Sequence, residues 1–471
     1  MYGADTLTTV PRVLVLNLVG LTPRLVESGA MPAVAAYARR HGLRPLRPDL
    51  PAVTCTVQAS MLLGVAPTTH GAVANGWYSR DLAEVGFWRQ SVRLVDQEGR
   101  LPSVFSRWRQ AHPDSPSAQL FWWWNLPSHA DLSVTPRPTY WADGRKGPDV
   151  HSHPVALRQR LRQNCGEFPL FDFWGPRAGI ASTRWITSAT LDVLREDRPG
   201  LTLAYLPHLD YDLQRYGPDG PEALRAAGEL DAEVKRLIEW AEGENTDLLI
   251  VSEYGITAAT RAVEPNRALR AAGLLAVHPA QNGALLDPGN SRAFAVCDHQ
   301  CAHVYVAQAS DLPRVTAILS SLPGVERVHQ RHEFAALGLD HARSGELFLV
   351  AAPGAWFAYP YWNQAQGDEE PDFARMVDIH RKPGYDPCEL LLDPSRPALK
   401  LRLAGKLLAK RLGFRVRFDP VPLDPSLVRG THGRLPDAPE TGPVWIGPER
   451  LAPGPEAVVS AARALAGICP R

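Results

Sequence analysis

Four short segments of the chain place a hydroxyl, a carboxylate or an imidazole beside an apolar run. They contain Thr54, Asp210, Glu253 and His432. A hydroxyl becomes a nucleophile when a neighbouring base or cation assists the loss of its proton. Carboxylate and imidazole groups are common ligands of divalent cations such as zinc. If one fold brings these side chains together, they could perform metal-assisted hydrolysis.

The elements that would position these residues alternate between apolar strands and amphipathic helices. Residues 12–20, 201–206 and 248–252 are apolar runs of strand length, and residues 23–40 and 222–242 have apolar positions at helical spacing. This alternation predicts an α/β fold with a largely parallel central sheet sandwiched by helices. In such a sheet a ligand binds outside the carboxyl ends of the strands.

The pattern changes after Gly255. A strand, a helix and two strands are predicted over residues 303–307, 312–322, 325–329 and 346–352. The main sheet is expected to resume at residues 443–447. We therefore expect a catalytic core of residues 1–256 and 428–471, with residues 257–427 inserted as an α+β cap.

Composition narrows the classes of partner. The 471 residues include 50 basic and 50 acidic ones, so the overall charge balance indicates neither nucleic acid nor a membrane surface. The expected partner is a small molecule, and the oligomeric state stays open. The first ten residues lack the features of a secretory signal, and no stretch reaches the roughly 18 apolar residues that span a bilayer. With six sparse cysteines, we expect a cytoplasmic protein with free thiols and no membrane span.

The segment around Thr54 carries the most specific motif. Pro51 precedes it, a predicted helix runs on to Gly64, and a proline-to-His-Gly turn follows at residues 67–71. This segment resembles the nucleophile segment of the alkaline phosphatase superfamily, in its nucleotide pyrophosphatase/phosphodiesterase branch. The resemblance implies that Thr54 is the attacking hydroxyl. A helix N-terminus favours the phosphoryl charge beside such a hydroxyl.

The other three segments are similar to metal-ligand segments of that family. Asp210 and His432 match the family's residues, and Glu253 keeps a carboxylate where the family has an aspartate. The resemblance implies one or two divalent cations held by these side chains. Zinc is the expected metal, with manganese and magnesium as alternatives.

Three positions depart from the family pattern. Gln214 and Tyr254 stand where the family has histidine ligands, and Val19 stands where it has an aspartate at the end of the first strand. These departures remove most ligands of one of the two metals. The nearest oxygen donor on the first strand is Asn17.

Two segments of the predicted cap could supply the missing ligands. One is residues 378–386, which contain His380. The other is residues 297–303, where alternating side chains would share one face of a strand and offer a zinc-like ligand set: Cys297, His299, Cys301 and His303. We expect His380, and next His299, to turn towards Thr54 and complete the metal site.

The resemblance implies hydrolysis of a phosphodiester, a pyrophosphate or a related phosphoester through a phosphothreonine. The alternative is a metal-poor, inactive relative that binds a phosphorylated small molecule. Thr54 could also be only the N-cap of its helix. The sequence assigns no role to His208, Asp212, Asp298 or His303.

Overall fold

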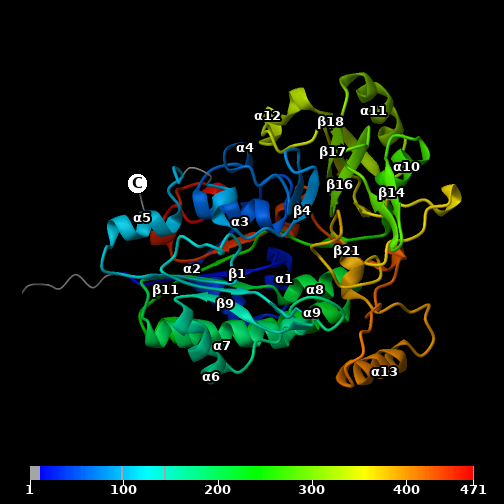
Figure 1. The fold of residues 1–471 in the computed structure, drawn as a ribbon. Coiled ribbons are helices and arrows are strands. Elements are labelled where there is room, and N and C mark those ends of the chain that lie inside the picture. Colours follow the sequence, from blue (N-terminus) through cyan, green and yellow to red (C-terminus); the bar gives the residue numbers. More distant parts are fainter. Residues whose placement is uncertain (1–10, 97–98, 143–144, 470–471) are drawn as a thin grey trace, which may run out of the picture.

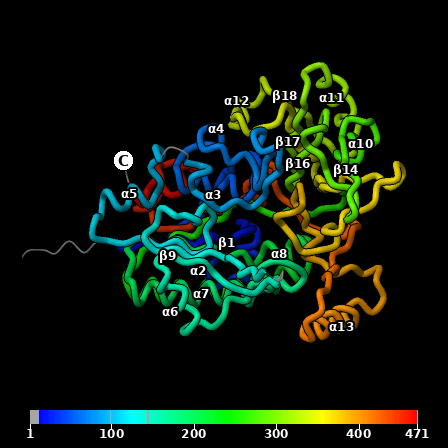
Figure 2. The backbone as a smooth tube through the Cα atoms, viewed as in Figure 1, coloured from blue at the N-terminus to red at the C-terminus, as the bar shows by residue number. Residues whose placement is uncertain are grey.

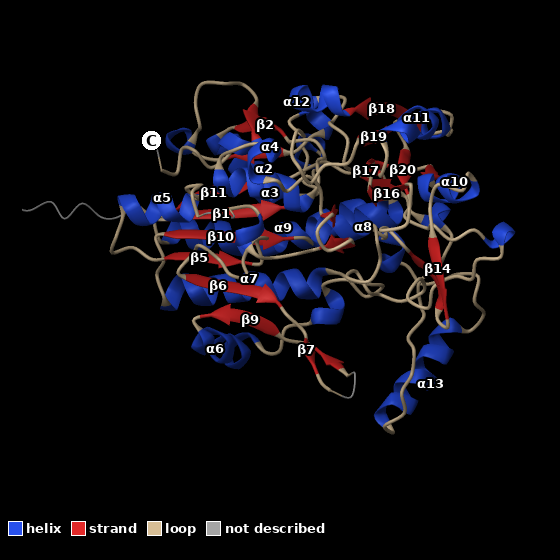
Figure 3. Cartoon of the chain, turned by 45° about the horizontal axis from the view of Figure 1, so that its top comes forward, coloured by secondary structure: helices blue, strands red, loops and turns tan. Residues whose placement is uncertain are grey.

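A computed structural model describes residues 11–96, 99–142 and 145–469. Its centre is a sheet of nine strands, which in chain order are β1 (Val13–Leu18), β2 (Leu43–Arg47), β5 (Ser117–Leu120), β6 (Leu132–Pro136), β9 (Val150–His153), β10 (Leu201–Leu206), β11 (Asp247–Val251), β22 (Val444–Ile446) and β23 (Val459–Ser460). Their order across the sheet is β23-β2-β22-β11-β1-β10-β5-β6-β9. The strands from β11 to β6 run parallel (Figure 3), whereas β22 and β9 are antiparallel to their neighbours. The predicted α/β fold with a largely parallel sheet is confirmed.

Helices cover both faces of this sheet (Figure 1). One face carries α3 (Thr54–Leu63) and α5 (Val104–Ala111), and the other carries α6 (Val155–Cys165), α7 (Ile180–Glu196) and α9 (Pro221–Gly243). Every residue of β1 and β10 is buried. Burial on both faces explains why these strands are continuous apolar runs rather than alternating ones.

One predicted helix differs from the structure. Residues 23–40 form two helices, α1 (Pro23–Glu27) and α2 (Pro32–His41), instead of one. Gly29 has a φ of 84°, and Pro32 cannot continue a preceding helix because it lacks an N–H group. The segment around Asp210 is the helix α8 (His208–Tyr216), which begins almost directly after β10.

A second, antiparallel sheet lies beside the first (Figure 2). It consists of β16 (Ala293–Asp298), β17 (Cys301–Val306), β19 (Leu347–Ala351) and β18 (Val325–Gln330), in that order. The helices α10 (Pro265–Ala271) and α11 (Leu312–Ser320) accompany it. The predicted strand, helix, strand and strand are confirmed, whereas β16 was not predicted. These elements bury a hydrophobic cluster of their own.

Short pairs of strands and further helices complete the described part of the fold. The pairs are β3 (Gly76–Ser79) with β4 (Glu84–Phe87), β7 (Thr139–Tyr140) with β8 (Lys146–Gly147), β12 (Thr257–Ala258) with β21 (Gly430–Thr431), β13 (Arg261–Val263) with β20 (Ala355–Phe357), and β14 (Val277–Ala280) with β15 (Gly283–Leu286). The remaining helices are α4 (Pro67–His70), α12 (Phe334–Leu337) and α13 (Leu399–Arg411). Among the described helices, none is long and apolar enough to cross a membrane. All six cysteines lie in the described ranges and are free thiols.

Candidate active site

All of the predicted site residues except His380 come together at the carboxyl ends of the central parallel strands. Thr54 is the first residue of α3, and Val53, in extended conformation, holds the N-cap position. The alternative that Thr54 is only an N-cap is therefore wrong. Asp210 lies in the first turn of α8, after β10, and Glu253 follows β11 by two residues. All of these polar side chains are buried, and Thr54 itself is only 4% exposed.

A chain of hydrogen bonds links the Thr54 hydroxyl to Asp210. The Thr54 Oγ1 lies 3.3 Å from the hydroxyl of Tyr254, which donates to Asp210 Oδ1 at 3.2 Å. The second oxygen of Asp210 accepts from the amide of Gln214 at 2.8 Å. Burial raises the pKa of Asp210 to about 7, against the smaller opposing effect of these two donors. A carboxyl group with this pKa can exchange a proton near neutral pH.

Glu253 forms the second acidic group of the site. Its Oε1 accepts hydrogen bonds from the amides of Asn17 and Gln58. Gln58 is four residues after Thr54, so it lies on the same face of α3. Burial raises the pKa of Glu253 to about 7, although these amides favour the ionised form.

Four aromatic rings stack in a continuous column beside these groups. Tyr254 stacks on His432 with ring centroids 3.5 Å apart, His432 lies 3.7 Å from His299, and His299 stacks on Tyr385 at 3.6 Å. The Tyr385 hydroxyl donates to Gln214 Oε1 at 2.9 Å. Hydrogen bonds therefore connect both ends of the column to Asp210: one end through Tyr385 and Gln214, and the other through Tyr254.

Hydrogen bonds define the tautomers of the two histidines. The His432 Nδ1 must donate to the carbonyl of Ala52 at 2.8 Å, and His299 Nδ1 lies 2.7 Å from a carboxylate oxygen of Asp298. Burial lowers the pKa of both histidines well below the usual value. Both rings are therefore neutral, with the lone pair on Nε2.

Asp298 connects this column to the segment that carries Thr54. It accepts hydrogen bonds from the backbone N–H and the side-chain amide of Asn75 at 2.7 and 3.1 Å. The oxygen of that amide accepts from the N–H of Cys55 at 2.9 Å. Burial raises the pKa of Asp298 to about 6, against these donors. Asp298 thus positions both His299 and the first turn of α3.

The side chains as arranged do not fit the cation pair that the resemblance implies. Both oxygens of Asp210 are occupied by donors from Gln214 and Tyr254, the residues that stand at histidine positions of the family. Within the described ranges, no group of three or more His, Cys, Asp or Glu side chains is arranged to hold a metal ion. Four buried acceptor atoms of the cluster nevertheless have no partner there: Asn17 Oδ1, Glu253 Oε2, His299 Nε2 and His432 Nε2.

The zinc-like set from the predicted cap does not share one strand face. His299 and Gln300 form the turn between β16 and β17, and His299 has a φ of 58°. Cys297 therefore lies on one strand, and Cys301 and His303 lie on the next. The predicted alternation is wrong because a hairpin interrupts it.

The structure does not bring His380 to the cluster. His380 is exposed at the surface, away from the buried cluster. Two residues whose roles the sequence left open make polar contacts elsewhere on α8. His208 lies 2.9 Å from Glu229, and Asp212 pairs with Arg215 and Arg225.

Several members of the cluster were not predicted as site residues. They are Asn17, Gln58, Asn75, Asp298 and Tyr385. Gln58 could have been found from its spacing, because it lies one helical turn after Thr54. Tyr385 lies in the segment that was expected to contribute His380. No local signal in the sequence indicates that Tyr385, and not His380, reaches the site.

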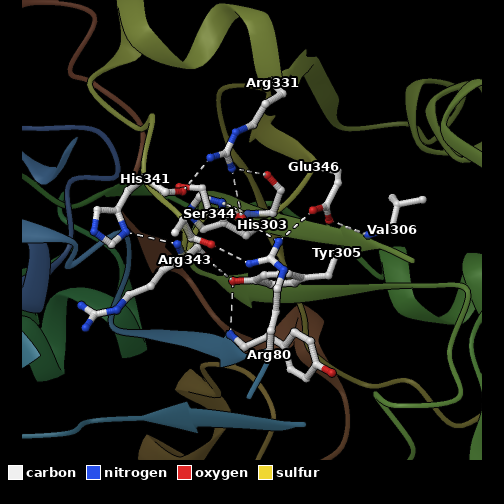
Figure 4. A network of polar contacts seen from close by, with 12 residues as sticks. Arg80, His303, Tyr305, Val306, Arg331, His341, Arg343, Ser344 and Glu346 are labelled. Carbon is white, nitrogen blue, oxygen red and sulfur yellow. Dashed lines mark hydrogen bonds and ion pairs between the residues drawn. The ribbon is translucent and has the colours of Figure 1, made fainter. Parts of the chain in front are cut away.

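A network of arginines joins the segment after α3 to the second sheet (Figure 4). Arg80 and Arg331 donate to backbone carbonyls of the loop 340–346. Arg343 belongs to this loop and extends from it. Arg343 donates to the carbonyl of Gly71 at 2.9 Å. In the same region, His303 Nε2 donates to the carbonyl of Val73 and its Nδ1 accepts from the N–H of Gly345, so this histidine is a connecting residue.

Replacing Gly71 by alanine is expected to disrupt this junction. Gly71 has a φ of 70°, and an added Cβ would lie 2.6 Å from the His341 ring and 2.9 Å from the Arg343 guanidinium. Gly338 is a matched control, because it has a φ of 72° and nothing within 4 Å of an added Cβ. We expect Gly338→Ala to cost about 1 to 2 kcal/mol of unfolding free energy, and Gly71→Ala to cost about 1 to 3 kcal/mol more. Denaturant titrations measure both losses of unfolding free energy. Equal losses for the two variants would show that His341 and Arg343 move aside without destabilising the fold.

Comparisons with known proteins identify the family of this chain. The sequence pattern of the family "Type I phosphodiesterase / nucleotide pyrophosphatase" matches residues 13–386. An uncharacterized pyrophosphatase/phosphodiesterase of Schizosaccharomyces pombe is 24% identical over 253 residues, which is 52% of this chain and 44% of that protein. The chain therefore matches less than half the length of this relative.

Two solved structures share the fold over almost the whole chain. Phosphonoacetate hydrolase from Sinorhizobium meliloti 1021 in complex with phosphonoformate has a TM-score of 0.59 at 15% identity, over 98% of this chain and 96% of that one. An inactive variant of murine ectonucleotide pyrophosphatase / phosphodiesterase 5, in complex with AMP, has a TM-score of 0.53 at 12% identity, over 98% and 94%. The match over residues 13–386 spans well over half of the chain, so this protein belongs to the type I phosphodiesterase / nucleotide pyrophosphatase family.

Proposed function

We propose that this protein hydrolyses a phosphodiester, a pyrophosphate or a related phosphoester with Thr54 as the attacking hydroxyl. The observation that carries the proposal is the chain of hydrogen bonds from Thr54 through Tyr254 to Asp210. Family membership supports the reaction class. The AMP and phosphonoformate in the related structures support a small phosphorylated or phosphonate substrate.

The hydrogen bonds define a route for the proton of Thr54. As Oγ1 forms its bond to phosphorus, its proton passes to the Tyr254 oxygen while the Tyr254 proton passes to Asp210. The bond between phosphorus and the leaving oxygen breaks, and water protonates that oxygen. The proton on Asp210 returns by the same route to the Thr54 oxygen when the phosphothreonine is hydrolysed. Water then attacks the phosphothreonine and releases Thr54. A carboxyl group with a pKa of about 7 is suited to both transfers.

Two features of the site favour the binding of an anionic substrate beside its acidic side chains. Thr54 lies at the N-terminus of α3, a ten-residue helix, where the backbone N–H groups favour a phosphoryl group. Burial also raises the pKa values of Asp210 and Glu253 to about 7. Below that pH both groups are mostly protonated, so they repel an anionic substrate less than ordinary carboxylates would.

The substrate must reach Thr54 through a surface that is closed in this structure. Tyr254 and Ala52 also line a pocket of about 60 Å³, together with Gln300 and Arg434. We propose that the substrate enters from this pocket and displaces the adjoining loops. A cytoplasmic location is also proposed, and the free thiols support it.

Hydrolysis of an aryl phosphodiester and of a dinucleotide pyrophosphate tests the proposal. The purified protein is assayed after treatment with a chelator, and again with added zinc, manganese or magnesium. Release of the aryl alcohol or the mononucleotide in any of these conditions is expected. Turnover confined to a metal-containing condition would show that the cluster rearranges to bind a cation.

The second candidate is a protein that binds a phosphorylated small molecule without turnover. The observation that favours it is that Gln214 and Tyr254 satisfy both oxygens of Asp210, which leaves this carboxylate no position for a cation. Saturable binding of AMP without hydrolysis under all of the conditions above would support this candidate against the first.

A further inference from the structure

The helix α13 and the loop after it carry a local charge that the whole chain does not have. Residues 399–418, here called the α13 segment, contain seven basic residues and no acidic one, although the net charge of the chain is zero. The helix projects from the body of the protein (Figures 1 and 2), and Leu399 is its only buried residue. This segment is not part of the proposed active site.

Large apolar side chains are concentrated on the same segment. Of the fifteen exposed large hydrophobic residues in the described part of the chain, five lie between positions 401 and 414: Leu401, Leu407, Leu408, Leu412 and Phe414, each 59 to 75% exposed. Single exposed leucines are normal, but a cluster of this kind indicates an interaction surface. Because these side chains are exposed to water, they contribute little burial free energy to the fold.

Three of the exposed leucines line up on one face of α13, whereas Leu407 lies on a flank beside the cations. Leu408 and Leu412 follow Leu401 by seven and eleven positions, so at about 100° per residue the three lie within about 20° of one line. On the same wheel, Lys400 and Arg411 lie about 80 to 100° to one side of that line, and Arg402 lies about 100° to the other. The result is an apolar ridge flanked on both sides by positive charge.

One basic residue anchors the helix and leaves the ridge free. Lys406 pairs with Asp419 and donates to the carbonyl of Arg417 at 2.7 Å, and Asp419 in turn pairs with Arg396 at 2.9 Å. Lys406 lies roughly opposite the leucine ridge on the helix. Within the described ranges, Lys400, Arg402 and Arg411 form no ion pair, so their charges are available to a partner.

We propose that the α13 segment binds the surface of a membrane that contains anionic lipids. An amphipathic helix lies in the plane of such a surface, with its apolar face among the acyl chains and its cations at the headgroups. A second copy of this chain is a poor occupant, because two segments of charge +7 would repel each other. The proposal is independent of the hydrolase activity.

Vesicle flotation with the full chain tests this proposal. Binding to vesicles of phosphatidylcholine with phosphatidylserine is expected, with little binding to phosphatidylcholine alone and a decrease as salt rises. A triple variant, Leu401→Glu with Leu408→Glu and Leu412→Glu, is expected to lower the partition coefficient at least about tenfold. Lys400→Gln and Arg411→Gln are expected to lower it about fivefold each.

The matched control is Leu82→Glu, because Leu82 is 67% exposed but lies on the turn between β3 and β4. This variant is expected to bind vesicles as the unmodified chain does. Absence of binding to anionic vesicles, equal binding to neutral ones, or unchanged binding by the triple variant would overturn the proposal. A dimer in solution that the triple variant abolishes would assign the ridge to a second copy instead, and would also overturn it.

Discussion

Replacing Thr54 by alanine is expected to abolish phosphoester hydrolysis, with a loss of at least about 10⁴-fold in kcat/KM, as for other nucleophile deletions. The loss follows because alanine has no oxygen that can attack phosphorus. Thr54→Ser keeps the hydroxyl, and we expect it to retain measurable turnover. Steady-state assays with an aryl phosphodiester compare the three proteins.

The same substitution separates chemistry from stability. Val53 and not Thr54 is the N-cap of α3, so alanine removes no cap. We expect the free energy of unfolding to change by less than about 1 kcal/mol. Retained turnover in Thr54→Ala would remove Thr54 as the nucleophile, whereas a global loss of stability would leave that variant uninformative and make Thr54→Ser the decisive comparison.

Asp210→Asn is expected to change activity and stability in opposite directions. Asparagine cannot take up the proton of Thr54, and loss of a general base typically lowers turnover by about 10² to 10⁴-fold. Its amide can still accept from Gln214 and donate to the Tyr254 oxygen, so the local hydrogen bonds are kept.

The pKa of Asp210 gives the sign of the stability change. This pKa is about 7 in the folded protein, against about 3.9 in an unfolded chain. Below about pH 4 the carboxyl group is protonated in both states, so its raised pKa does not lower the free energy of unfolding. Between pH 4 and 7 the unfolded chain releases the proton while the folded protein keeps it, so stability falls as pH rises. Above pH 7 the penalty is complete.

Asp210→Asn should therefore be more stable than the unmodified protein at pH 8, by on the order of 2 to 4 kcal/mol, and about equally stable at pH 4. Denaturant titrations at the two pH values measure this difference. Glu253 and Asp298 titrate in both proteins. The charge of Asp210 influences the pKa of Glu253 less than burial and hydrogen bonds do, so most of the contribution of Glu253 and Asp298 cancels in the comparison. A variant that is less stable at pH 8 than the unmodified protein would contradict the raised pKa of Asp210.

The fold could be predicted largely from local patterns. The buried strands β1, β10 and β11 are apolar on both faces, and such runs are visible without tertiary information. The break between α1 and α2 was also encoded locally, by Gly29 and Pro32, but the helical spacing of apolar residues masked it.

The site could be predicted only in part, because its remaining members depend on tertiary contacts. Asp210, Glu253 and His432 were found because each follows a recognisable strand or motif. The stack of Tyr254, His432, His299 and Tyr385 joins four distant segments, and no spacing along the chain encodes it. The hairpin turn at His299 had no glycine or proline to reveal it. The assignment of residues 257–427 to an inserted cap stays a prediction.

The most direct test of the central claim is to trap the covalent intermediate. The protein is mixed with an excess of an aryl phosphodiester, quenched in acid during turnover, and digested for peptide mass spectrometry. The proposed mechanism predicts a phosphoryl adduct on Thr54, absent from Thr54→Ala. Turnover with no adduct on Thr54, or an adduct on another residue, would contradict it.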